Sequence, residues 1–143
     1  MNKAGGYDVE ELQPGMTASV SKTVTEADIL MFAGVSTDIN PAHLNEEYAK
    51  DTQFGGRIAH GMLSASFISA VLANKLPGPG TIYLGQTLKF KAPVRIGDTV
   101  TATVTVREVI PEKKRCILDA VCTVNGKPVI EGESTMYCTS AKG

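Results

Sequence analysis

The sequence predicts an α+β fold in which antiparallel strands surround one buried helix. Two observations indicate this fold. From His60 to about Leu76 the chain has no charged side chain before Lys75, which is typical of a helix with apolar neighbours on all sides. Beyond residue 80 the apolar pattern changes to the alternation of strands, most clearly over 99–106, where hydroxyl and apolar side chains take turns.

Length and composition predict one globular domain. The chain has 143 residues, of which 43% are hydrophobic and 20% charged, so we expect residues 1–143 to form a single domain. Its formal charge of −1 provides no overall field that would attract nucleic acid or an anionic membrane. Because neither a secretory signal nor a membrane span is apparent, we expect a cytoplasmic protein without nucleic acid or membrane partners.

The cysteines predict neither a disulfide framework nor a zinc site. Cys116, Cys122 and Cys138 are an odd number, and no two of them have the spacing of a zinc-binding pair. We therefore expect three reduced, buried thiols.

The first half of the chain predicts one strand followed by helices. An arm up to about Gly15 leads into a strand over 17–24. Thr25 and Asp28 have the spacing of a capping box, in which each side chain satisfies a free amide at a helix start. A helix is therefore expected to begin here and to end near Gly34.

A proline separates this helix from the next. The residue before proline avoids helical backbone, so Asn40 and Pro41 predict an irregular connection between Asp38 and His43. Side chains on such a connection are free to point at a ligand. Asn45 is suited to cap a short second helix, and a glycine turn then leads to the long apolar helix.

The second half of the chain predicts an antiparallel sheet. Prolines and glycines over 77–80 stop the long helix. Strands are expected over 81–90, 99–106, 115–124 and 128–137. Asn125 and Gly126 form the dipeptide that best fits a two-residue type I′ hairpin, so the last two strands are expected to pair directly.

The long helix also predicts a homodimer. A helix that is apolar on every side must be covered on every side, and one sheet covers only one of its faces. The remaining face then has to be covered by a second copy of the chain or by loops, and we expect the second copy. This arrangement resembles the hot-dog fold, in which a curved antiparallel sheet wraps a long central helix and two protomers commonly join their sheets.

Asp38 and His43 form the first candidate site. A carboxylate and an imidazole at this spacing can hold one water, because an imidazole has an ordinary pKa of about 6.5 and exchanges protons near neutral pH. We do not expect zinc, since the spacing differs from that of a helical zinc motif and no third ligand is apparent. On spacing alone, a helix-terminating aspartate and a surface histidine are the alternative.

The start of the long helix forms the second candidate site. The N–H of Gly61 is not shielded by a side chain and lies at the positive end of the helix dipole, so it suits a carbonyl oxygen that gains negative charge. Ser66 lies about one turn further and is a candidate contact to substrate or to a catalytic group, although helical serines commonly bond their own carbonyls. Alternatively, Gly61 only permits close packing and His60 caps the helix. A serine nucleophile is not predicted, because the G-x-S-x-G elbow is absent.

Together these motifs resemble the MaoC-like dehydratase family, and within it the (R)-specific enoyl-CoA hydratases that supply polyhydroxyalkanoate synthesis. The resemblance extends from about Gly15 to Tyr137. Its matching segments are 38–43, 58–63, 83–86, 90–94 and 96–98.

The resemblance implies a hydro-lyase that adds water to trans-2-enoyl-CoA and forms (R)-3-hydroxyacyl-CoA. It implies that Asp38 and His43 activate the water and that the Gly61 amide binds the thioester carbonyl. Ser66 corresponds to a serine beside the catalytic aspartate, and His60 is expected to be structural. No metal or redox cofactor is implied, because coenzyme A enters as part of the substrate.

Other functions stay open at this point. A hot-dog acyl-CoA thioesterase would use the same helix N-terminus to cleave the thioester, although such enzymes generally lack the Asp38/His43 loop in this form. A non-catalytic acyl-binding module is a further alternative. An acyl-carrier-protein substrate is a variation on the hydratase, and the residues suited to its phosphates, or to those of coenzyme A, are Lys89, Lys91 and Arg95.

Overall fold

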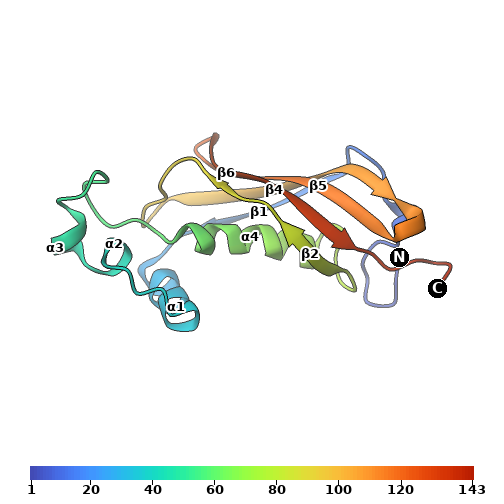
Figure 1. The fold of residues 1–143 in the computed structure, drawn as a ribbon, viewed down its shortest axis with the longest axis horizontal. Helices are drawn as coiled ribbons and strands as arrows, with labels where there is room; N and C mark the ends of the chain where they lie inside the picture. Colours follow the sequence, from blue (N-terminus) through green and yellow to red (C-terminus); the bar gives the residue numbers. More distant parts are fainter.

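The computed structural model describes residues 1–143, and its centre is the long helix α4 (Gly61–Asn74). Figure 1 shows the sheet along one side of α4, with the helices α1, α2 and α3 at one end of the molecule and both chain termini at the other. The α+β arrangement of a curved antiparallel sheet around a central helix is thus confirmed within one chain. No helix is both long and apolar enough to cross a membrane.

The sheet is antiparallel throughout its strand pairings. Its order is β1-β4-β5-β6-β2, and β3 pairs with β6. The strands are β1 (Thr17–Thr23), β2 (Ile82–Gln86), β3 (Lys89–Phe90), β4 (Thr99–Ile110), β5 (Arg115–Val124) and β6 (Lys127–Tyr137). The other α-helices are α1 (Glu26–Ser36), α2 (Pro41–Leu44) and α3 (Glu46–Ala49), and single 3-10 turns lie at Val9–Glu11 and Pro111–Lys113.

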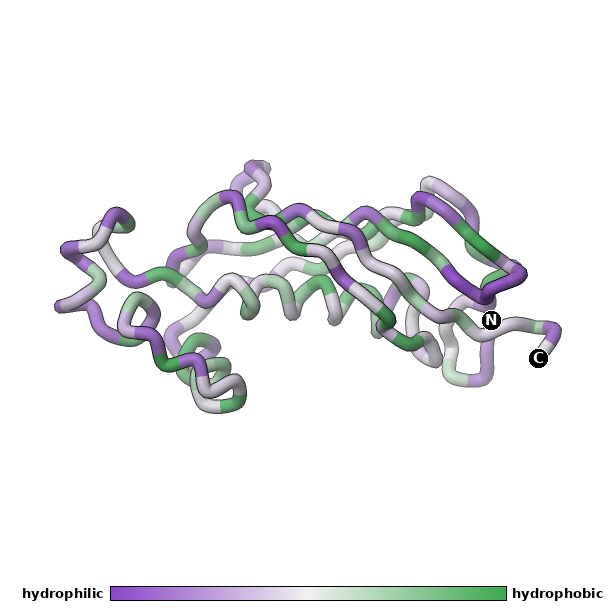
Figure 2. The backbone as a smooth tube through the Cα atoms, in the orientation of Figure 1, coloured by the Kyte–Doolittle hydropathy of each residue, from purple (hydrophilic) through white to green (hydrophobic).

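The core lies between the sheet and α4. Strand β4 buries every second residue from Val100 to Val106 and turns its threonines outward, as the two-residue period of a strand requires. Figure 2 shows this alternation of hydrophobic and hydrophilic residues along the long strands. From α4, Ile68, Val71 and Leu72 are fully buried against the sheet. Burial of these apolar side chains is the main force that holds helix and sheet together.

Three local predictions are confirmed. Thr25 accepts a hydrogen bond from the Asp28 amide at 3.1 Å, and the Asp28 carboxylate accepts one from the Thr25 amide at 2.9 Å. Asn45 caps α3 with its side-chain oxygen. Asn125 and Gly126 both have positive φ, 51° and 78°, as a type I′ turn requires.

Two strand boundaries differ from the predicted ones. The strand expected over 81–90 is two strands, β2 and β3, interrupted where the backbone of Thr87 crosses Gly132 of β6 at very short range. Strand β4 continues to Ile110 instead of ending near Val106, and its register against β5 shifts beyond Val106. Both differences arise from contacts between strands, and the alternation of apolar and polar residues within one strand does not indicate such contacts.

Within a single chain α4 is buried on one face only, as expected for a helix whose remaining face needs further cover. Met62 is 54% exposed, and Ser66 and Ala73 on the same side of the helix are exposed as well. The physical reason is that the sheet of one chain reaches only one face of α4. An exposed stripe of α4 therefore remains.

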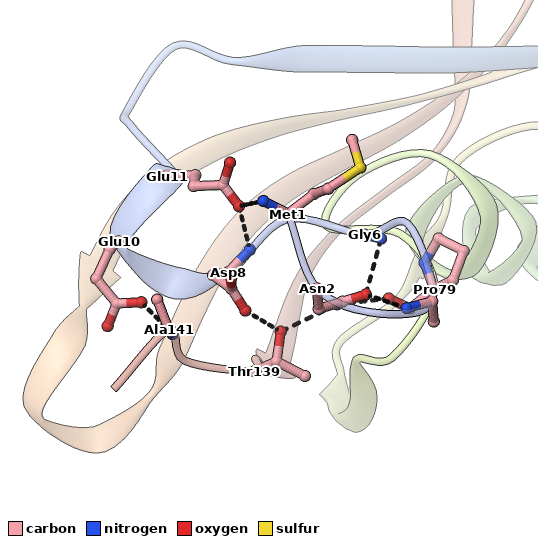
Figure 3. A network of polar contacts seen from close by, with 10 residues as sticks. Met1, Asn2, Gly6, Asp8, Glu10, Glu11, Pro79, Thr139 and Ala141 are labelled. Atoms are coloured by element: carbon pink, nitrogen blue, oxygen red, sulfur yellow. Dashed lines mark hydrogen bonds and ion pairs between the residues drawn. The ribbon is translucent and has the colours of Figure 1, made fainter. Parts of the chain in front are cut away.

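Hydrogen bonds attach the first residues of the chain to two later segments (Figure 3). The Asn2 side chain donates to the carbonyl of Pro79 at 2.8 Å and to the hydroxyl of Thr139 at 3.0 Å. Thr139 in turn donates to the Asp8 carboxylate at 2.7 Å. This network joins the N-terminal arm, the turn after α4 and the segment after β6.

The close crossing at Gly132 predicts a stability difference between two glycines on neighbouring strands. A Cβ at Gly132 would lie 1.9 Å from the Thr87 carbonyl oxygen, whereas a Cβ at Gly85 on β2 meets nothing within 4 Å. We expect Gly132→Ala to lower the free energy of unfolding by about 2 kcal/mol or more, because backbone must move to relieve the overlap. Gly85→Ala, the control, should change it by less than about 1 kcal/mol. Urea unfolding measures both values, and equal stabilities would contradict the expectation.

Candidate active site

A cavity of about 430 Å³ opens at the N-terminal end of α4. Its wall combines the segment around α2, the turn before α4 and the chain around β3. Three of the four predicted site residues, Asp38, His43 and Gly61, line this cavity. Residues that are far apart in the sequence are therefore gathered in one hollow.

His43 lies on a helix and not on the irregular connection that the sequence predicted. Pro41 occupies the first position of α2, where its missing N–H costs nothing. The Asn40 side chain caps this turn by accepting from the Ala42 amide at 3.0 Å. Only Asp38 lies on irregular backbone, between α1 and α2.

A backbone carbonyl orients the His43 ring. Nδ1 of His43 lies 2.8 Å from the carbonyl oxygen of Ile58. A carbonyl only accepts, so Nδ1 carries the hydrogen and Nε2 of the neutral ring keeps its lone pair. The Ile58 amide also donates to the Ala42 carbonyl at 3.2 Å, which attaches α2 to the turn before α4.

His60 is buried directly behind this ring. It is 1% exposed, and its ring centroid lies 4.0 Å from that of His43. Nε2 of His60 lies 2.9 Å from the backbone carbonyl oxygen of Asp38 and donates to it. The His60 side chain makes no capping bond to α4, so its contacts favour a structural role in holding the Asp38 segment.

Asp38, His43 and His60 form one cluster. Each offers a carboxylate oxygen or ring nitrogen, and these atoms lie within 4.8 Å of one another. The expectation that no third metal-ligating group accompanies Asp38 and His43 is therefore wrong, because the fold adds His60. A carboxylate with two imidazoles suits either proton transfer or a divalent metal.

Gly61 begins α4 and fulfils two requirements at once. Its N–H makes no hydrogen bond within the protein, as is usual for the first amide of a helix. A Cβ at this position would lie 2.5 Å from the ring of Phe90, which also lines the cavity. Glycine therefore allows the close approach of Phe90 and leaves a free donor at the cavity wall.

The structure does not bring Ser66 to the cavity. Its hydroxyl donates to the Leu63 carbonyl at 2.5 Å, within the same helix, and within one chain it makes no hydrogen bond to Asp38. The role assigned to Ser66 stays a prediction. The serine that lines the cavity is Ser64, which sequence reasoning missed. Its signal was its position four residues after His60, on the same side of the helix.

Arg57 connects the elements around the site, and sequence reasoning did not identify it either. Its Nε donates to the backbone carbonyl of His43 at 2.6 Å. Its two terminal nitrogens each lie 2.9 Å from the carboxylate of Glu26 on α1. A bidentate pair of this kind restricts the guanidinium to one orientation. Arg57 therefore joins α1, α2 and the turn before α4.

The three basic residues considered for phosphate binding have different surroundings. Lys91 lines the cavity and lies 3.4 Å from Glu131, whereas Lys89 is exposed on β3. Arg95 is engaged within the protein, since its guanidinium donates to the backbone carbonyl of Phe54. Lys89 and Lys91 are thus the more available cations.

The cysteines are free and buried, as predicted. Burial raises the pKa of Cys116 to about 12 and that of Cys122 and Cys138 to about 11. These thiols stay protonated near neutral pH, so they do not supply a nucleophile.

Known proteins are similar to this chain in sequence and in fold. A (R)-specific enoyl-CoA hydratase of Rhodospirillum rubrum is 64% identical over 127 residues, which cover 89% of this chain and 88% of that protein. A 3-hydroxybutyryl-CoA dehydratase of Methylorubrum extorquens is 48% identical, over 87% of this chain and 80% of its own length. The unliganded structure of R-hydratase PhaJ1 from Pseudomonas aeruginosa matches with a TM-score of 0.89 and 44% identity, covering 94% of this chain and 87% of that one.

The family comparison agrees with these relatives. The model of the MaoC like domain matches residues 9–126, a span that includes the whole cluster at the cavity and all of α4. The chain therefore belongs to the MaoC-like family.

Proposed function

We propose that this chain is an (R)-specific enoyl-CoA hydratase, which adds water reversibly to trans-2-enoyl-CoA and forms (R)-3-hydroxyacyl-CoA. The observation that carries the proposal is the meeting of Asp38, His43 and the free N–H of Gly61 at one cavity. The similarity to the Rhodospirillum rubrum hydratase over most of both chains supports the same reaction.

In the proposed reaction, the Asp38 carboxylate and Nε2 of His43 hold one water molecule. The water oxygen bonds to C3 of the enoyl group, and one water proton passes to the dyad. A proton from the dyad is delivered to C2, so the substrate gains the atoms of one water and the dyad returns to its initial state. The bond from Nδ1 of His43 to Ile58 supports this assignment, because it leaves Nε2 as the accepting nitrogen.

The thioester carbonyl accepts a hydrogen bond from the N–H of Gly61. Attack at C3 moves negative charge onto this oxygen, as in an enolate. The N-terminus of α4 provides both the free donor and the positive end of the helix dipole, which stabilise that charge.

The reaction needs no metal or redox cofactor in this proposal. Water, the dyad and the enoyl thioester balance every atom and electron of the hydration. Coenzyme A takes part only as the thiol portion of the substrate. Asp38, His43 and His60 are accordingly assigned to proton transfer and positioning and not to metal binding.

We also propose that the enzyme is a homodimer. Strand β2 is an edge of the sheet, and its residues Ile82, Tyr83 and Leu84 are exposed. The side of α4 that includes Met62 is exposed too. A second copy that pairs β2 with β2 would cover both surfaces and extend the sheet.

The first prediction for the proposed function separates hydration from thioester cleavage. The protein is incubated with crotonyl-CoA while the enoyl absorbance and free thiol are followed together. Hydration lowers the absorbance without thiol release. Release of thiol would instead identify a thioesterase, and no change in either signal would favour a binding module. The same assay with an acyl-carrier-protein thioester compares the two carriers.

The second prediction concerns Asp38. Asp38→Asn keeps the size of the side chain but removes its ability to take a proton, so kcat should fall by about two to four orders of magnitude. Asp119→Asn is the matched control, because Asp119 is exposed on β5 and pairs with Arg107 outside the cavity. Its kcat should equal that of the wild type. A folded Asp38→Asn variant with wild-type turnover would refute the assigned mechanism.

The third prediction concerns the dimer. Leu84→Glu would place a carboxylate from each copy in the proposed β2 contact, where it loses its hydration, so sedimentation velocity should show a monomer. Ser19→Glu, on the opposite edge strand β1, is the control and should remain dimeric. Dimers of unchanged stability in the Leu84→Glu variant would exclude this interface.

A further inference from the structure

Two buried polar atoms at the cavity lack a hydrogen-bond partner within the protein. They are Nδ1 of His60 and the hydroxyl oxygen of Ser64. Each residue is 1% exposed, and both line the cavity. A buried polar group without a hydrogen bond lowers the stability of the fold. Its presence at a candidate active site therefore requires a functional explanation.

The two atoms are complementary as donor and acceptor. Nε2 of His60 donates to the Asp38 carbonyl, so the neutral ring has its lone pair on Nδ1. The Ser64 hydroxyl provides a donor, and the residue lies four positions after His60, which is one helical turn. Ser66 shows the contrast, because its hydroxyl is already bonded to the Leu63 carbonyl.

We propose that Ser64 is a positioning residue, whose hydroxyl donates to a water at the cavity that in turn donates to Nδ1 of His60. This contact holds His60 in the tautomer with hydrogen on Nε2, and that hydrogen holds the backbone carbonyl of Asp38. The consequence for catalysis rests on the proposed hydratase function, whereas the contact itself does not.

The tautomer matters because of what faces Nε2. If the hydrogen moved to Nδ1, Nε2 would present a lone pair to the Asp38 carbonyl oxygen, 2.9 Å away. Two acceptors at that distance repel each other, so the segment that carries the Asp38 carboxylate would shift. The neighbouring His43 ring, which is tilted by 30° and has its centroid 4.0 Å from that of His60, would lose this support as well. Substrate binding at the Gly61 amide is not part of this chain of contacts.

The test uses ¹⁵N-histidine labelling, since the chain has only two histidines. His43→Gln removes one set of ring signals and assigns the other to His60. In the wild type we expect His60 with hydrogen on Nε2 and with Nδ1 as a hydrogen-bonded acceptor. In Ser64→Ala the Nδ1 signal should move toward that of an unbonded nitrogen or of mixed tautomers, and Ser64→Thr should restore it.

Kinetics provide the second readout. Ser64→Ala should lower kcat by about tenfold and change KM by less than about twofold, because Asp38 is displaced while the substrate contacts remain. Ser134→Ala is the matched control: Ser134 is fully buried, but its hydroxyl contacts Gln86 on β2 and does not line the cavity. It should leave kcat and both His60 nitrogen signals unchanged.

Several results would overturn the proposal. If the wild-type ring signals assigned to His60 show hydrogen on Nδ1, or an unbonded Nδ1, the proposal is refuted. Unchanged His60 signals in a folded Ser64→Ala variant would refute it whatever the activity. Failure of the wild type to hydrate crotonyl-CoA would instead refute the proposed function, while the nitrogen signals would still decide whether Ser64 contacts His60.

Discussion

The arrangement of the site depends on two backbone carbonyls that accept hydrogen bonds from two imidazoles. The Ile58 carbonyl accepts from His43 and the Asp38 carbonyl accepts from His60. Because a carbonyl oxygen has no hydrogen to offer, each contact determines both the ring orientation and which nitrogen carries the hydrogen. These contacts leave one free lone pair on each ring and bring the segments before α2 and before α4 together.

The rest of the fold supports this pair of contacts. Helix α4 is held against the sheet by its buried apolar face, so its first amide, that of Gly61, has a defined position at the cavity. Arg57 and Glu26 connect α1 to the carbonyl of His43 on α2. Rigid support of this kind suits proton transfer, which requires donor and acceptor within hydrogen-bond distance.

Much of the local structure could be predicted from the sequence, because it depends on neighbouring residues. The capping box at Thr25 and Asp28 and the type I′ turn at Asn125 and Gly126 each involve residues at most three positions apart. The alternation in β4 reports a buried and an exposed face in the same local way. The break between β2 and β3 was not predictable, since it arises where Thr87 crosses another strand.

By itself, the sequence determined the fold class, the main helices and strands, and the motifs that contain Asp38, His43 and Gly61. Only the tertiary structure decided how these motifs meet. The contact between His60 and Asp38 joins residues 22 positions apart, and Ser64 is distinguished from Ser66 only by the surface that each side chain faces. Residue spacing encodes which groups a helix or turn presents, whereas the packing of α4 against the sheet sets which of them share a cavity.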